Sequence, residues 1–478
     1  MNTNEHLVDL ISRHIAQGAY RVAERLPSLR EFSQLHQVSI ARAIQVYAEL
    51  ADRGLVEVRD RAGYFVAPAG GSRQPTPNAD WSGAGDFESF VVATLGSKPA
   101  ADRVSFSAAY PGGDLFPIGD MHRMLRTASR VHRPSDFVYE DADGLLALRQ
   151  RIARLYANHG ERVSPAEIVP TSGGMEAVQL ALSACTSPGE SAVGVESPSF
   201  YPMLQALRRF GLRPVALPTG PTQGLDVAAA IDAMKLRRVS ALLLMPTFHN
   251  PLGCTLSDAA KQALAQAAAQ YGVAIVENDP YRDLYFGDVA PNPIKHFDES
   301  GWVLHCGSFS NTLAPGYSVG WLAAGRFQTK VRDLRFFTNM TAGLLPQRAV
   351  AAYLSVGGAR GAYAHHLVRL RATLKERVAF GLNLLGTVLP SGAWFSRPQG
   401  GFMVWVRLHE GVDTLALNAR AQTLGISLAP GPVYSLSSSH RNNFALNFGW
   451  DWNARRVAAL EQLGPLIAKW PGERGSAD

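Results

Sequence analysis

The chain has 478 residues, of which 46% are hydrophobic and 18% charged, with a net charge of +6. This length exceeds one typical core and predicts more than one domain in a soluble protein. The sequence lacks the order of a signal peptide, an apolar run long enough to span a bilayer, and paired cysteine spacing. We therefore expect a cytoplasmic protein with no membrane partner, no disulfide framework and no metal site.

The first predicted unit covers residues 1–68. Residues 5–17 have the apolar spacing of an amphipathic helix, a short helix follows near Leu29, and Ser39 has the residue type that caps a second helix ending at Asp52. The runs LVEVR and GYFVA then predict two short strands joined by a charged turn. This order is that of a winged helix-turn-helix.

Three segments of this unit, RLPSLRE, VSIARAIQVYAEL and GYFVAP, resemble the GntR class of bacterial repressors. The resemblance implies that the helix between Ser39 and Asp52 is the recognition helix, which enters the DNA major groove. The implied DNA contacts are Ser28, Arg30, Ser39, Arg42, Gln45, Arg59 and Arg61. Ile40 stands where relatives commonly have arginine. Residues 1–66 hold eight Arg against eight Asp plus Glu, so DNA binding would depend on where the charges lie. A winged helix used only for protein contacts remains the alternative.

Residues 69–85, rich in Gly, Pro, Ala and Ser, predict a linker. We expect a large domain over 86–358, where apolar strand runs alternate with Ala- and Leu-rich helical runs. This alternation predicts a mixed, mainly parallel sheet with helices on both faces. Residues 359–478 begin with a long helical run and continue into short strands, which predicts a small α+β domain.

The stretch HCGSFSNTLAPGYSVGWL (305–322) resembles the segment that presents the Schiff-base lysine in fold-type I pyridoxal-phosphate (PLP) enzymes, usually SFSKTLAPG. Five other stretches, YEDADG, TSGGMEAVQLAL, ESPSFYPML, MPTFHNPLG and VENDPYRDLYF, occur in the order found in that family. The resemblance implies a phosphate cradle at Gly174 and Met175, a ring-stacking Phe200, ring-hydroxyl partners Asn250 and Tyr281, and a Tyr139 that reaches the neighbouring subunit.

Four groups that hold and activate PLP in that family are replaced. Asn311 stands in place of the lysine, and an amide cannot form the internal aldimine. Asn278 replaces the carboxylate at the pyridine nitrogen, Ser318 replaces the phosphate arginine, and Ala445 replaces the arginine for the substrate carboxylate. We therefore expect no cofactor and no catalysis, with weak noncovalent PLP binding left open. Asp279 would point to the opposite face from Asn278.

A cavity should remain at this position. Its candidate lining is Tyr139, Gly174, Met175, Phe200, Asn250, Tyr281, Ser308, Ser310 and Arg441. The alternative is a collapsed pocket in a domain that only dimerises.

A GntR-type winged helix joined to an aminotransferase-like domain resembles the MocR type of bacterial transcription regulator. The resemblance implies a homodimer that binds double-stranded DNA. Combined with the four replacements, it predicts an inactive pseudo-aminotransferase that senses a small molecule other than a PLP aldimine. Two alternatives are a regulator that binds PLP noncovalently and a working PLP-dependent aminotransferase.

Overall fold

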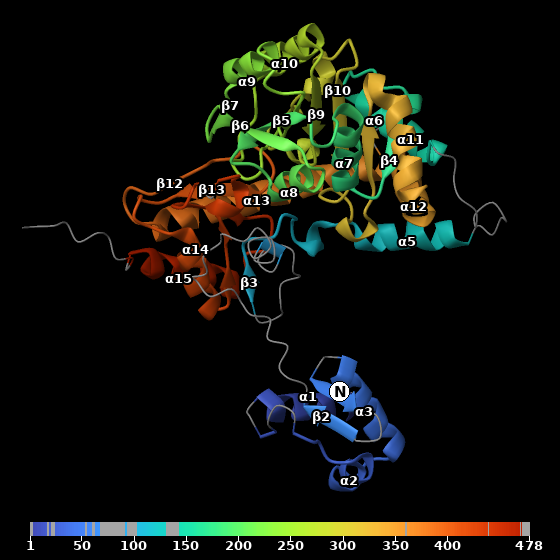
Figure 1. Ribbon diagram of the computed structural model, residues 1–478, viewed down its shortest axis with the longest axis vertical. Coiled ribbons are helices and arrows are strands. Elements are labelled where there is room, and N and C mark those ends of the chain that lie inside the picture. Colours follow the sequence, from blue (N-terminus) through green and yellow to red (C-terminus); the bar gives the residue numbers. More distant parts are fainter. Residues whose placement is uncertain are drawn as a thin grey trace, which may run out of the picture. The chain divides into compact units, whose positions relative to one another are not determined.

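The computed structural model divides the chain into two compact units, Met1–Asp86 and Phe87–Asp478 (Figure 1). The structure describes residues 3–16, 19–20, 24–52, 55–59, 63–66, 91–92, 103–130, 143–358, 361–437, 439–468 and 470. The predicted linker, Arg61 and Tyr139 lie outside these residues.

The first unit is a winged helix-turn-helix, as predicted. Its elements are α1 (Thr3–Ala16), α2 (Leu29–Leu35), α3 (Ile40–Asp52), β1 (Val56–Arg59) and β2 (Gly63–Val66). The two strands pair antiparallel to form the wing. Phe32 and Tyr47 are fully buried, their ring centroids lie 4.9 Å apart, and the Tyr47 hydroxyl donates to the carbonyl of Pro27 at 2.7 Å. This packing joins α2 to α3.

The second unit is built on an eight-stranded sheet with the order β4-β11-β10-β9-β8-β5-β6-β7. Its strands are β4 (Ile168–Thr171), β5 (Ala192–Ser197), β6 (Arg213–Gly220), β7 (Gly224–Leu225), β8 (Ala241–Leu244), β9 (Ala274–Asn278), β10 (Val303–Ser308) and β11 (Gly320–Ala323). The five neighbouring strands β10, β9, β8, β5 and β6 run parallel to one another, whereas β4, β7 and β11 pair antiparallel with their neighbours. The predicted mixed, mainly parallel sheet is confirmed.

Helices cover both faces of this sheet (Figure 1). The helices packed against it are α6 (Leu146–Asn158), α7 (Gly174–Cys185), α8 (Tyr201–Arg209), α9 (Val227–Lys235), α10 (Asp258–Tyr271) and α11 (Gln328–Asn339). Helix α12 (Leu344–Ser355) packs on α6, and α5 (Ile118–Ser129) packs on α12. Strand β9 shows why two cores form: Val276 packs in the core under α7 and α8, whereas Ile275 packs in the core under α9 and α10. Successive strand residues point to opposite faces, so a one-residue step changes the environment completely.

The C-terminal part packs beside this sheet. It contains α13 (Ala362–Val388), β12 (Trp394–Phe395), β13 (Met403–Arg407), α14 (Thr414–Thr423), β14 (Ile426–Ser427), β15 (Ala429–Pro430), β16 (Asn443–Asn447) and α15 (Ala454–Ala468). The early strand β3 (Val104–Ser105) pairs in parallel with β14, and the Asn447 amide donates to the carbonyl of Tyr110 at 2.8 Å. Residues near 104–110, predicted within the large domain, thus pack with the small one. Among the described helices, none combines the length and apolar character needed to cross a bilayer.

Candidate functional site

The turn after β10 carries the residue that departs most from the aminotransferase pattern. The Ser308 hydroxyl donates to the Ser310 hydroxyl at 2.9 Å, and the Ser310 N–H donates to Ser308 Oγ at 3.1 Å. These bonds shape the turn that presents Asn311. Asn311 is buried, and its side-chain amide forms no hydrogen bond with another described residue. Position 311 therefore offers an amide that can donate and accept, but no amine nucleophile.

A glycine-rich helix start faces this turn. Gly173 has a φ of 91°, which favours glycine, and α7 begins at the next residue, Gly174. A β-carbon on Gly174 would lie 3.2 Å from the Ser308 Cβ, so the backbone approaches the β10 turn closely. The first N–H groups of a helix lack partners within the helix and attract anions. Gly174, Met175, Ser308 and Ser310 therefore lie around one potential phosphate position.

Ser318, the residue in place of the phosphate arginine, has a different role. It follows the short helix η7 (Pro315–Tyr317) with a left-handed φ of 49°. Its hydroxyl donates to the carbonyl of Ser172 at 3.1 Å, and the side chain is exposed. The serine thus ties the 315–318 loop to the start of α7 and supplies no charge.

Asn250 and Tyr281 meet in the buried interior. The Asn250 amide nitrogen donates to the Tyr281 hydroxyl at 3.2 Å, and both residues are at least 98% buried. The Asn250 carbonyl oxygen has no hydrogen-bond partner in the described part of the chain. Burial raises the pKa of Tyr281 well above its usual value, so its phenol stays protonated. This pair retains unused polar capacity of the kind that a ring hydroxyl would satisfy.

Phe200 and Asn278 lie on the side of the sheet that faces α8. Phe200 caps α8, is half-buried, and its ring stands edge-on to that of Tyr201 with centroids 5.4 Å apart. Asn278 at the end of β9 is buried, and its amide lies 3.3 Å from the Met203 sulfur. An amide at this position is uncharged and cannot stabilise a protonated pyridine as a carboxylate does.

Asp279 cannot replace the carboxylate missing at Asn278. Its side chain points to the opposite face of the sheet, where its Oδ2 lies 3.1 Å from Nε2 of His305. The predicted one-residue change of face is therefore present in the structure.

Two predicted positions lie in the C-terminal part. Ala445 is fully buried in the middle of β16. The Arg441 guanidinium is 59% exposed and forms an ion pair with Asp413, which caps α14. Arg441 is therefore engaged by Asp413, and no hydrogen bond or ion pair in the described part of the chain joins it to Asn250, Tyr281, Ser308 or Ser310.

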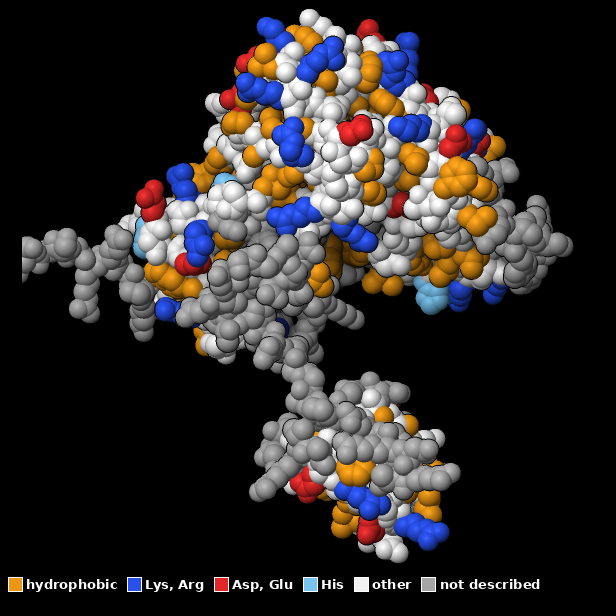
Figure 2. Space-filling view, viewed as in Figure 1, with side chains coloured by type: hydrophobic (Ala, Val, Ile, Leu, Met, Phe, Trp, Pro, Cys, Tyr) orange, Lys and Arg blue, Asp and Glu red, His pale blue; other side chains and the backbone are white. Residues whose placement is uncertain are grey.

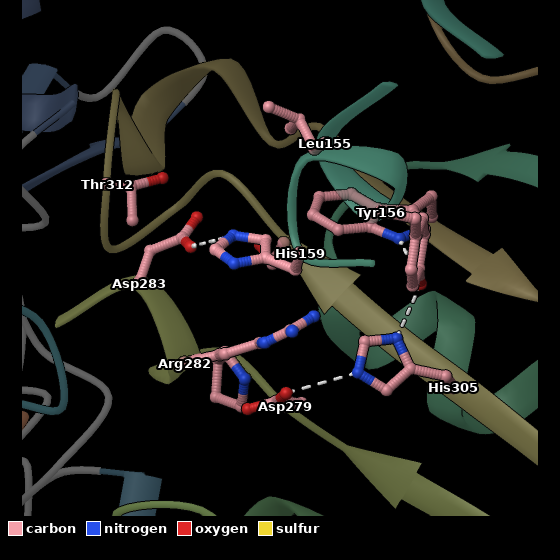
Figure 3. A pocket seen from close by; sticks show the side chains of 11 residues that line it. Leu155, Tyr156, His159, Asp279, Arg282, Asp283, His305 and Thr312 are labelled. Atoms are coloured by element: carbon pink, nitrogen blue, oxygen red, sulfur yellow. Dashed lines mark hydrogen bonds and ion pairs between the residues drawn. The ribbon is translucent and has the colours of Figure 1, made fainter. Parts of the chain in front are cut away.

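Sequence reasoning missed a buried polar network on the opposite face of the sheet. Glu277, Asp279 and His305 place side-chain ligand atoms within 4.8 Å of one another. His305 Nδ1 lies 2.6 Å from the Tyr156 hydroxyl, which also accepts from the Trp321 indole at 3.0 Å (Figure 3). Glu277 accepts from two backbone N–H groups, those of Ile294 and Lys295. These hydrogen bonds hold the cluster together, whereas Oδ1 of Asp279 has no hydrogen-bond partner in the described part of the chain. His305 lies 26 residues after Asp279, so spacing along the sequence did not reveal the network.

The stability of this network should depend on pH. Burial lowers the pKa of His305, but the hydrogen bond to Asp279 and the charge of Glu277 outweigh it and raise the pKa above its usual value. A raised folded-state pKa adds stability that is fully present below the unfolded pKa, about 6.5, and is lost as the pH rises through the folded value. Urea unfolding of the wild type at pH 6 to 9 should show this loss.

The variant His305→Gln should lower the free energy of unfolding by about 1–3 kcal/mol at pH 6, because Asp279 and Tyr156 lose a buried partner. It should also flatten the pH dependence. The exposed control His122→Gln should behave as wild type. An unchanged pH slope in His305→Gln would contradict this assignment.

The winged helix presents a second candidate site on α3. Ala43, Val46, Tyr47 and Leu50 are fully buried, whereas Arg42 and Gln45 are exposed on the other side of the same helix. Side chains of this kind are available to DNA.

The remaining predicted DNA contacts have varied placements. The Ser39 hydroxyl accepts from the N–H of Arg42 at 3.2 Å, and Ser28 forms a capping box with Glu31 at the start of α2. Arg30 is exposed, as is Ile40. Arg59 ends β1, but its side chain lies outside the described residues, as does all of Arg61.

Comparisons with known proteins assign both units. Residues 3–66 match the gntR family of bacterial regulatory proteins, and residues 115–446 match the family of class I and II aminotransferases. An HTH-type transcriptional regulator of Escherichia coli, YdcR, is 34% identical over 98% of this chain and 99% of its own length. The similarity thus spans both units in one protein.

Two solved structures resemble the second unit at 26% identity. Kynurenine aminotransferase of Pyrococcus horikoshii, solved with PMP, has a TM-score of 0.71 and covers 77% of this chain and 91% of its own. The α-aminoadipate aminotransferase LysN of Thermus thermophilus, solved with N-(5'-phosphopyridoxyl)-L-leucine, has a TM-score of 0.70 and covers 77% and 92%.

The prediction that this domain has no cofactor is therefore wrong, because both of these similar aminotransferases were solved with PLP-derived groups. The prediction gave decisive weight to four replaced anchors. It gave too little to the cradle and to the Asn250–Tyr281 pair, which persist.

The fold, the two family matches and the full-length similarity to a transcription regulator agree with the resemblance found in the sequence. The chain belongs to the MocR type of GntR-family transcription regulators, in which a winged helix-turn-helix is fused to an aminotransferase domain.

Proposed function

We propose that this regulator is a homodimer that binds DNA through α3 and holds a PLP-type ligand noncovalently in an aminotransferase domain that does not transaminate. One observation carries the proposal. Asn311 occupies the turn after β10, in which Ser308 closely approaches the glycine cradle, and the domain keeps the buried Asn250–Tyr281 pair. Binding groups are retained while the nucleophile is absent.

The residues present fit the ligand at two ends. The α7 N-terminus with Ser308 and Ser310 would hold a phosphate, and the Asn250–Tyr281 pair would hold a ring hydroxyl. When bound, PLP supplies an aldehyde that amines attack and a ring that withdraws electrons. Asn311 cannot attack that aldehyde, and Asn278 cannot keep the ring nitrogen charged. The binding of the ligand, and not its chemical turnover, is therefore what regulates DNA binding.

An exposed apolar surface on the aminotransferase domain supports the homodimer. It comprises Ile118 on α5, Phe336 and Phe337 on α11, Met340, and Leu345 on α12. Phe337 is 83% exposed. Figure 2 shows hydrophobic side chains gathered on this side of the domain. A soluble protein rarely leaves such a surface uncovered, and a two-fold interface between identical subunits would bury it.

Homodimerisation would give the two winged helices a defined relation to paired DNA half-sites. A ligand then changes DNA binding only if its affinity differs between two arrangements of the dimer.

Titration of the full-length protein with PLP tests the ligand part of the proposal. The absorbance of the bound ligand should saturate, and borohydride treatment followed by intact-mass measurement should add no mass to the wild-type chain. Asn250→Ala should weaken binding about tenfold, because one buried hydrogen bond to the ligand is lost. The exposed control Gln262→Ala should bind as wild type. Absence of saturation would refute ligand binding, and a reduced lysine adduct would refute the absence of covalent chemistry.

A further inference from the structure

A second cleft is lined by residues of α6 and of the first half of α13. Its volume is about 250 Å³. The residues that determine its chemistry are Arg151, Arg154, His159, Asp283, Tyr363 and Arg371. Its lining includes none of the residues that we assign to the PLP-type ligand.

Two arginines on α6 contribute unpaired charge to this cleft. Arg151 and Arg154 are three residues apart, which places both on one side of the helix. Neither side chain has a hydrogen-bond or ion-pair partner among the described residues. Their guanidinium groups therefore remain available to a ligand.

A third arginine is held in position on the opposite wall. The Arg371 guanidinium stacks over the Tyr285 ring, 4.2 Å from its centroid, and lies within 3.4 Å of the Asp283 carbonyl. The aromatic ring and the carbonyl orient the guanidinium but leave its positive charge without a carboxylate partner.

Among the described residues that line the cleft, Asp283 is the one carboxylate, and other groups already engage it. It accepts a hydrogen bond from the Tyr363 hydroxyl at 3.1 Å, and His159 lies 3.8 Å away (Figure 3). Burial lowers the pKa of His159, which favours the neutral imidazole. In the described lining, three guanidinium groups therefore face one carboxylate, an excess of two positive charges.

The floor of the cleft contacts the turn that carries position 311. The Tyr363 hydroxyl lies 3.2 Å from the Thr312 hydroxyl, and His366 Nε2 lies 2.6 Å from the Thr312 carbonyl oxygen. A ligand in this cleft would therefore lie against Tyr363, one of the two side chains that contact the residue directly after Asn311.

We propose that this cleft is a second ligand site, specific for a small dianion such as a phosphate monoester or a dicarboxylate. Guanidinium groups form paired, charge-assisted hydrogen bonds with the oxygens of both classes. Two negative charges match the excess positive charge. The cleft is slightly smaller than the usual range for drug-sized ligands and fits a compact metabolite. The inference does not depend on the proposed binding of PLP.

Isothermal titration calorimetry of the full-length protein, at constant ionic strength, tests the site with inorganic phosphate and, separately, with succinate. At least one of these probes should bind saturably, and the one that binds identifies the class. The double variant Arg151→Gln/Arg154→Gln should bind it about 100-fold more weakly, because two charge-assisted interactions are lost. The matched control Arg208→Gln/Arg209→Gln removes two exposed arginines from α8 and should bind as wild type.

Phosphate could also enter the cradle at α7, so a further variant separates the two sites. Ser308→Ala/Ser310→Ala should retain the phosphate binding that the Arg151/Arg154 variant loses. Saturable binding of neither probe would overturn the proposal. Loss of binding in the serine variant together with full retention in the arginine variant would also overturn it.

Discussion

Replacing Arg42 with alanine should weaken DNA binding by about tenfold or more, since a lost base contact costs about 1–3 kcal/mol. Arg42 lies on the exposed side of α3, while Ala43 and Val46 anchor the other side in the core. The substitution removes a charge from the helix that the winged-helix fold presents to the major groove. It should leave the packing of that helix intact. Fluorescence anisotropy on DNA flanking the gene, over a range of salt concentrations, measures the effect.

The salt dependence separates two roles for Arg42. A phosphate contact predicts that the slope of log K against log salt falls by about one, whereas a base contact predicts a loss that varies with DNA sequence. Arg13→Ala is the matched control, because Arg13 is an exposed arginine on α1 of the same unit. Equal affinities for wild type and Arg42→Ala, with both folded, would show that α3 does not read DNA.

Restoring lysine at position 311 should create covalent attachment where the wild type has none. Asn311 follows the serine-stabilised turn and lies beside the glycine cradle, so an amine there would lie near the aldehyde of a PLP-type ligand. Borohydride treatment of Asn311→Lys with PLP should add mass to a peptide containing residue 311. Transamination should remain very weak, because Asn278 leaves the ring nitrogen without its carboxylate and Ser318 supplies no phosphate charge.

A lysine placed elsewhere controls for nonspecific reaction. Gln262→Lys adds an exposed lysine on α10 and should give no more adduct than wild type. If Asn311→Lys reacts no more than Gln262→Lys, position 311 does not face a PLP site and the proposed pocket is wrong.

The fold could be predicted from the sequence because its signals are local. Alternating apolar strands and helices predicted the mixed sheet, and the cap residue Ser39 marked the start of the helix that ends at Asp52 in the first unit. The period of two along a strand also predicted that Asp279 and Asn278 face opposite sides. These features depend on residues close together in the chain.

Long-range partners could not be predicted in this way. Asp413 holds Arg441 across 28 residues, and His305 reaches Tyr156 across 149. The arginine cleft likewise joins α6 to α13, which are distant in sequence. No local sequence pattern indicates such pairs, because they form only after the helices pack on the sheet.

The cofactor prediction failed for an energetic reason. It treated the replacements as independent losses and added the costs of the missing phosphate arginine and pyridine carboxylate, although contributions within one site are not additive. It also gave too little weight to polar groups that stay paired or unsatisfied in the pocket, such as the carbonyl oxygen of Asn250. A ligand can be retained by the contacts that remain when the covalent bond is absent.

Footprinting of the DNA that flanks the gene, with full-length protein at moderate salt and with or without PLP, tests the central claim most directly. The account predicts two protected half-sites that Arg42→Ala abolishes, and a change in their protection when PLP is added. Absence of protection by the folded wild-type protein under both conditions would contradict it.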